Sequence, residues 1–122
     1  MTYDEAFEKI QSLFGKDGYK GWELVAPDSL LTFRSKGGMI QFLELEESFD
    51  SSKAVLCEKS YRISDYSIWD LWEKCDHWWP TYEEFLNVPL FRKFEYLYDQ
   101  EQLGIELPIE EAYKRYLTAL KQ

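Results

Sequence analysis

The first apolar residues of the chain recur at helical spacing. They follow Thr2 and Glu5, whose separation is that of a capping box, in which each side chain satisfies an unpaired N–H of the first helical turn. Gly15 and Gly18 then provide a stop signal. This pattern predicts a helix over residues 3–14, with an apolar stripe of Phe7, Ile10, Leu13 and Phe14.

From Gly21 onward the apolar residues follow a period of two, which is typical of strands. The adjacent glycines Gly37 and Gly38 readily adopt the positive φ angles that a tight hairpin requires. Glu44 and Glu46 come near the end of one run, which suggests a strand that leaves the core for solvent. We therefore predict a small antiparallel sheet of three to four strands in a meander, drawn from residues 21–26, 30–34, 39–46 and 53–63.

The second half of the chain returns to helical spacing. Ser67 with Asp70 and Thr81 with Glu84 have the spacing of N-cap signatures, and Pro108 is tolerated in the first turn of a helix. These signals predict three to four C-terminal helices packed on the sheet. The expected fold is a single globular α+β domain over residues 1–122, with helices covering one face of the sheet.

Composition supports a folded chain and restricts its partners. The chain has 122 residues, which suits one domain, and its 5 Trp, 9 Tyr and 8 Phe provide ample material for a core. The net charge is −9, and the 14 lysines and arginines are scattered without a basic run. Nucleic acids and anionic membranes both require clustered positive charge. We therefore expect no direct nucleic-acid binding and no membrane association.

The N-terminal segment and the cysteines bear on the compartment. The first residues are acidic where a signal peptide needs positive charge and an apolar stretch, so we expect a cytoplasmic protein. The only cysteines are Cys57 and Cys75. A chain of this size in a reducing compartment needs no disulfide, so we expect both to be buried free thiols.

Candidate chemistry is sparse. His77 is the only histidine, and Cys75 two positions earlier would point away from it on a helix, so neither a metal site nor a Cys–His nucleophile is indicated. No phosphate-binding or nucleophile-elbow motif is present. We predict no catalytic residue, no metal and no cofactor. The paired glutamates are Glu46–Glu47, Glu83–Glu84 and Glu110–Glu111, and the last two pairs fit helix N-termini.

The stretch from Tyr61 to Phe85 is unusual because aromatic and acidic residues alternate there, and it holds four of the five tryptophans. Trp72 and Trp79 share a helical stripe that predicts the core, whereas the other two tryptophans lie off its centre. Tryptophan and tyrosine concentrate at protein-binding hot spots. We predict a partner-binding site formed by Trp69, Asp70, Glu73, Asp76, Trp78, Glu83 and Glu84. The alternative is that all the rings simply fill the core.

These features favour a non-catalytic protein that binds, and inhibits or masks, a protein partner with a basic surface. In composition alone the chain resembles, as a class, immunity proteins that block nuclease toxins and phage proteins that inhibit nucleic-acid-binding enzymes. One alternative is a structural or regulatory subunit that forms a homo-oligomer through its C-terminal helices. Another is a small hydrolase that uses carboxylates.

Overall fold

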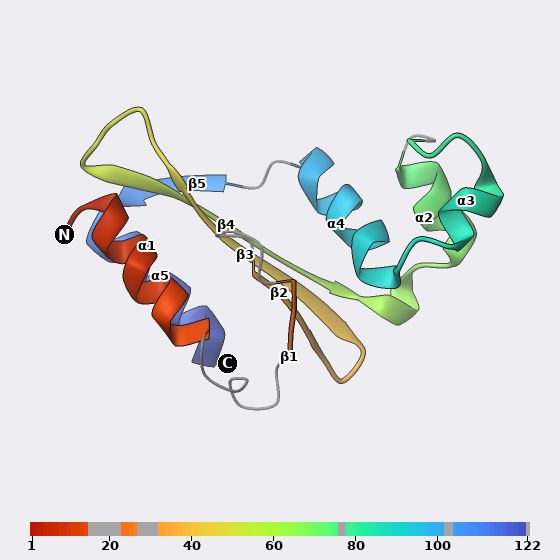
Figure 1. Cartoon of the computed structure of the whole chain (residues 1–122), viewed down its shortest axis with the longest axis horizontal. Helices are drawn as coiled ribbons and strands as arrows, with labels where there is room; N and C mark the ends of the chain where they lie inside the picture. Colours follow the sequence, from red (N-terminus) through yellow and green to blue (C-terminus); the bar gives the residue numbers. More distant parts are fainter. Residues whose placement is uncertain (15–22, 27–31, 76–77, 102–103, 122) are drawn as a thin grey trace.

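The computed structural model describes residues 1–14, 23–26, 32–75, 78–101 and 104–121. It has an N-terminal helix, an antiparallel sheet and C-terminal helices (Figure 1), which confirms the predicted α+β fold class. None of the helices in the described part combines the length and apolar character needed to cross a bilayer. In chain order the elements are α1 (Tyr3–Phe14), β1 (Glu23–Ala26), β2 (Thr32–Lys36), β3 (Met39–Glu47), β4 (Lys53–Arg62), a 3-10 turn (Ile63–Asp65), α2 (Ile68–Lys74), α3 (Tyr82–Leu86), α4 (Leu90–Glu101), β5 (Gly104–Pro108) and α5 (Ile109–Lys121).

The strands form one sheet in the order β1-β2-β3-β4-β5, and each neighbouring pair is antiparallel. The first four strands are the predicted meander. Gly37 and Gly38, with φ angles of 54° and 82°, form the turn between β2 and β3. The fifth strand lies outside the predicted meander. Its alternation of Ile105 and Leu107 with Glu106 has a strand period, but it covers only five residues beside a predicted helix start.

Alternate residues of β3 and β4 lie on opposite faces of the sheet, and both faces are apolar. Leu45 pairs with Leu56 on one face, and Ile40 pairs with Tyr61 on the other. Helices α1 and α5 cover the first face, and α2, α3 and α4 lie on the second (Figure 1). The prediction that helices cover one face was therefore wrong. Since both faces of the two central strands are apolar, both must be removed from water.

The layer formed by α1 and α5 packs closely on the sheet. Tyr116 of α5 and Ile10 of α1 are almost fully buried against Leu43 and Leu45 of β3. The hydroxyl of Tyr3 donates a hydrogen bond of 2.9 Å to the carbonyl oxygen of Leu45. The apolar residues Ile109, Ala112, Tyr116 and Ala119 of α5 are therefore buried within the chain itself.

The second layer is attached to the sheet through α4. The rings of Phe42 and Tyr98 stack with their centroids 4.8 Å apart and an interplanar angle of 13°. Tyr61 contacts Phe94 at 5.6 Å, and its hydroxyl donates a hydrogen bond of 2.8 Å to Glu101. Burying a large apolar side chain stabilises a fold by roughly 1.5–3 kcal/mol. These contacts give α2 and α3 a fixed support.

Helices α2 and α3 are short, and their predicted N-caps are present. Ser67 accepts a hydrogen bond of 3.1 Å from the Asp70 N–H, while the Asp70 carboxylate accepts one of 3.2 Å from the Ser67 N–H. Thr81 accepts one of 3.1 Å from the Glu84 N–H. Isolated helices of seven and five residues are not stable in water, so capping and packing together determine where these helices lie.

Candidate functional site

The two tryptophans assigned to the predicted partner-binding site are exposed. Trp69 has an exposed fraction of 52%, and Trp78 one of 67%. Trp72 is buried and Trp79 partly buried, as predicted. Eight large apolar side chains are exposed in the described part of the chain, and five of them lie between residues 68 and 90. Exposed apolar area is therefore concentrated between the start of α2 and the start of α4.

Trp69 is held in place although its ring is exposed. Its indole N–H donates a hydrogen bond to the Glu73 carboxylate, one turn further along α2. Its ring meets Tyr82 of α3 edge-on, with centroids 5.2 Å apart. Such ring contacts contribute about 0.5–1.5 kcal/mol of stability in addition to the free energy gained from the area that they bury. The indole therefore bridges the two short helices in one orientation.

Trp78 is supported in the same way from α4. Its centroid lies 5.1 Å from that of Tyr96, which also lies 5.1 Å from Trp79. Trp79 in turn contacts Phe85, which is fully buried, at 5.2 Å. Both exposed indoles are therefore the outer members of chains of ring contacts that lead into the core.

Two of the predicted carboxylates, Asp70 and Glu73, lie on α2 with Trp69, whereas Trp78 lies in the segment before α3. Asp70 belongs to the α2 capping box, and Glu83 and Glu84 occupy the first turn of α3. Asp76 lies outside the described residues. We call the six described members of the predicted site, all exposed, the aromatic–acidic surface: Trp69, Asp70, Glu73, Trp78, Glu83 and Glu84.

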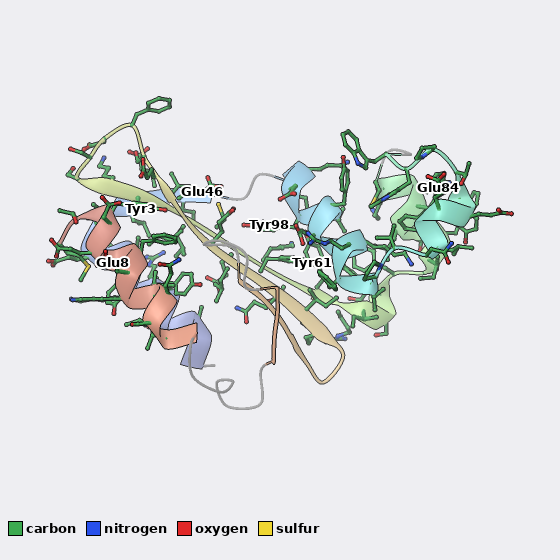
Figure 2. The ribbon with its side chains drawn as sticks, in the orientation of Figure 1. Tyr3, Glu8, Glu46, Tyr61, Glu84 and Tyr98 are labelled. Carbon is green, nitrogen blue, oxygen red and sulfur yellow. The ribbon has the colours of Figure 1, made fainter. Side chains whose placement is uncertain are left out.

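Negative charge dominates this part of the molecule. Between residues 65 and 84 the described side chains include five carboxylates, and Lys74 is the single lysine or arginine among them. The ion pairs found among the described residues involve other segments of the chain. Figure 2 shows Glu84 at the outer end of α3, remote from the sheet. In the part of the chain that the structure describes, no ion pair therefore neutralises these carboxylates.

A second group of polar side chains lies beside α4, over β3, β4 and β5. The strand register places Glu44 opposite Cys57, and Cys57 opposite Gly104. These residues line a pocket of about 520 Å3, together with others that include Glu46 and Tyr98, both labelled in Figure 2. We call it the acidic pocket: Glu44, Glu46, Val55, Cys57, Tyr98, Asp99 and Gly104. Sequence reasoning missed this site because its members are separated along the chain and meet only through the register.

Like charges oppose one another in the acidic pocket. The hydroxyl of Tyr98 donates a hydrogen bond of 3.3 Å to Glu44. Burial raises the pKa of Glu44 to about 7, with further contributions from a hydrogen bond to Glu46 and from the charges of Glu46 and Asp99. Loss of solvent and the charge of Glu46 also raise the pKa of Asp99. Within the described residues no ion pair neutralises these carboxylates.

Both cysteines are buried free thiols, as predicted. Burial raises the pKa of the Cys57 thiol, although the hydroxyl of Tyr98 within hydrogen-bonding reach counteracts part of this effect. Burial alone raises the pKa of Cys75 to about 11, and its sulfur lies 3.6 Å from the carbonyl oxygen of Lys93. A pairing of either thiol with His77 concerns a residue outside the described part.

The geometry gives little support to a carboxylate-dependent hydrolase. Three carboxylates, those of Glu44, Glu46 and Asp99, line the acidic pocket, and Glu44 and Glu46 are hydrogen bonded to each other. Glycosidases keep their two carboxyl groups at least about 5 Å apart so that the substrate's reacting atoms lie between them. The direct hydrogen bond between Glu44 and Glu46 leaves no such space between these two carboxyl groups.

No family model, curated protein or solved structure matches the chain. Its function must therefore be inferred from its own residues. The aromatic–acidic surface combines exposed rings with negative charge, whereas the acidic pocket is lined by potential ligand atoms.

Proposed function

We propose that this protein binds a second protein that carries a basic surface and masks that surface. The contact is made by the aromatic–acidic surface. The observation that carries the proposal is the pair of indoles, Trp69 and Trp78, which are about half or more exposed while neighbouring rings hold them in one orientation. Large rings that are fixed and exposed bind a partner with little loss of side-chain entropy.

The rings supply most of the affinity in this proposal. Tryptophan is enriched among the interface residues whose truncation costs about 2 kcal/mol or more of binding free energy. A loss of about 2 kcal/mol weakens the affinity about thirtyfold. Ile68 on α2, Leu86 on α3 and Leu90 on α4 add exposed apolar area. Contiguous apolar area with a polar rim is characteristic of protein-binding sites.

The carboxylates determine which partner is selected. A protein with a net charge of −9 attracts a basic partner over several ångströms and accelerates association. Glu73, Glu83 and Glu84 are exposed, so opposite charges on the partner remain partly hydrated beside them. Such contacts weaken as salt is added, because exposed charges are screened within about 10 Å at 0.1 M ionic strength.

The homo-oligomer alternative receives less support. It depends on an apolar face of the last helix that is free to meet a second copy. Ile109, Ala112, Tyr116 and Ala119 of α5 are instead buried against the sheet and α1. The described part of α5 therefore offers mainly polar residues to a second copy.

Affinity capture with matched charge-reversal variants tests the proposal. The first bait is the unmodified chain, and the second carries Glu73→Lys and Glu83→Lys on the aromatic–acidic surface. The third carries Glu5→Lys and Glu8→Lys on α1, which covers the other face of the sheet. Each variant reverses two exposed carboxylates, one of which lies in the first turn of its helix.

We expect a basic protein to be captured by the unmodified chain and by the α1 variant, and to be lost from the Glu73→Lys/Glu83→Lys variant. Recovery should fall as salt is raised. Recovery of no basic protein, or equal recovery with all three baits, would contradict the proposed function.

A further inference from the structure

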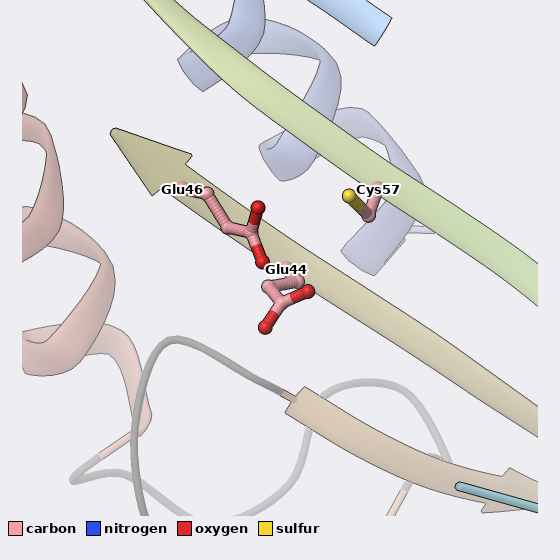
Figure 3. Close-up of side chains that lie close together, drawn as sticks. All are labelled: Glu44, Glu46 and Cys57. Atoms are coloured by element: carbon pink, nitrogen blue, oxygen red, sulfur yellow. The ribbon is translucent and has the colours of Figure 1, made fainter. Parts of the chain in front are cut away.

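Three potential metal ligands of two chemical types converge in the acidic pocket. A carboxylate oxygen of Glu44, one of Glu46 and the sulfur of Cys57 all lie within 4.8 Å of one another. Figure 3 shows the two carboxylates close together on β3, with the sulfur of Cys57 on the neighbouring strand β4. Ligands around a tetrahedral Zn2+ ion are about 3.4–3.6 Å apart. Rotation of the flexible glutamate side chains brings the ligand atoms to this shorter separation.

The space around the sulfur of Cys57 remains open because residue 104 is a glycine and has no side chain. A Cβ atom on Gly104 would lie 3.0 Å from the sulfur of Cys57 and 2.5 Å from a methyl carbon of Val55. Glycine at position 104 therefore allows β5 to approach while the sulfur still lines the pocket. Cys57 is only 7% exposed, so its sulfur is fixed by packing, whereas Glu46 is exposed and reachable from solvent.

The charge of the pocket is unbalanced within the described part of the chain. Glu44, Glu46 and Asp99 line it together, and no lysine or arginine is among the described lining residues. Placing three carboxylates together is unfavourable unless protons or a cation compensate them. Tyr98 supplies the type of outer hydrogen bond that orients metal-binding carboxylates, because its hydroxyl donates to Glu44.

We propose that the acidic pocket binds a Zn2+ ion through Glu44, Glu46 and Cys57. A thiolate combined with carboxylates is a ligand set for a borderline-soft divalent ion, whereas Mg2+ and Ca2+ take oxygen ligands alone. Formation of the sulfur–metal bond releases the thiol proton to solvent, and the proton held in the hydrogen bond between Glu44 and Glu46 is released as their oxygens bind the ion. Water entering from the pocket occupies the remaining coordination position. The site is independent of the proposed protein binding, since it is built from different residues.

Metal titration of the purified full chain tests this inference. Zn2+ binding is followed by calorimetry, and Co2+ serves as a spectroscopic probe because a cobalt–thiolate bond gives a charge-transfer absorption band. We expect one ion per chain. Cys57→Ser should abolish the band and lower Zn2+ affinity at least about tenfold. Glu46→Gln should lower the affinity by a similar factor while keeping the band.

Two variants serve as matched controls. Cys75→Ser removes the other buried thiol, and His77→Ala removes the only histidine. Both should bind Zn2+ as the unmodified chain does, and circular dichroism should show that every variant is folded. Glu46 is exposed, so Glu46→Gln tests the site even where a cysteine variant fails to fold. Absence of Zn2+ binding, or binding lost in Cys75→Ser or His77→Ala and retained in Cys57→Ser, would overturn the inference.

Discussion

The indole N–H of Trp69 donates a hydrogen bond to the carboxylate of Glu73, four residues later in α2, while the ring remains 52% exposed. One helical turn therefore presents an apolar ring and a negative charge as a single unit. The edge contact with Tyr82 limits the ring further. A side chain with restricted rotation loses little entropy when a partner covers it, which favours binding.

Truncating an exposed ring should affect folding far less than truncating a buried ring nearby. Trp78→Ala removes a side chain that is 67% exposed, so we expect a loss of less than about 1 kcal/mol in the free energy of unfolding. Phe85→Ala removes a fully buried ring from the core beneath the same helices and should cost about 3–5 kcal/mol. Urea denaturation of both variants checks this. Equal losses would mean that Trp78 acts as a core residue.

The acidic pocket should make stability depend on pH. The pKa of Glu44 is raised from 4.5 to about 7, so the folded chain holds this proton more tightly than the unfolded chain does. Its stabilising contribution is complete below pH 4.5 and is lost as the pH rises through 7. Glu44→Gln should therefore stabilise the metal-free protein at pH 8, by on the order of 1 kcal/mol after allowance for solvent screening, and have little effect near pH 4.5.

A control at the neighbouring strand position separates this effect from a general change in charge. Glu58→Gln makes the same substitution at an exposed residue next to Cys57 on β4. Thermal unfolding with a chelator present, at pH 5 and pH 8, should show a stability gain at pH 8 for Glu44→Gln that Glu58→Gln does not share. A gain of equal size at both pH values would contradict the assignment of the proton to Glu44.

Much of the fold follows from local signals in the sequence. Helix α1 covers the predicted residues, and the Ser67–Asp70 and Thr81–Glu84 caps start helices where expected, because capping depends on residues close together in the chain. The use of both sheet faces was missed, although adjacent buried residues such as Phe42 and Leu43 indicated it. Strand β5 was missed because five residues carry a weak periodic signal.

The two candidate sites differ in how far the sequence reveals them. Trp69 and Trp78 were separable from Trp72 by their positions relative to one helical stripe, which is local information. The acidic pocket depends on the pairing of β3 with β4 and of β4 with β5, which places Glu44 beside Cys57. Residues brought together by sheet register share no motif along the chain.

The close approach of β5 to β4 should make Gly104 intolerant of a side chain. Gly104→Ala places a Cβ within 2.5 Å of a methyl carbon of Val55, and the overpacking should cost about 1–3 kcal/mol. Val55→Ala removes that methyl carbon, so the double variant should lose less stability than the sum of the two single variants. Denaturant unfolding of the four proteins of this cycle measures the coupling. Additive losses would show that the two residues are not in contact.

Binding of the captured basic partner is the most direct test of the central claim that the aromatic–acidic surface is a protein-binding site. Kinetics should be measured with the unmodified chain, Trp69→Ala, Trp78→Ala, Glu73→Lys/Glu83→Lys and the α1 control at low and moderate salt. We predict dissociation at least about tenfold faster for each tryptophan variant. Association should be slower for the charge-reversal variant, with a weaker salt dependence, and the α1 control should keep the affinity of the unmodified chain. Equal affinities for the unmodified chain, the tryptophan variants and the charge-reversal variant would contradict the account.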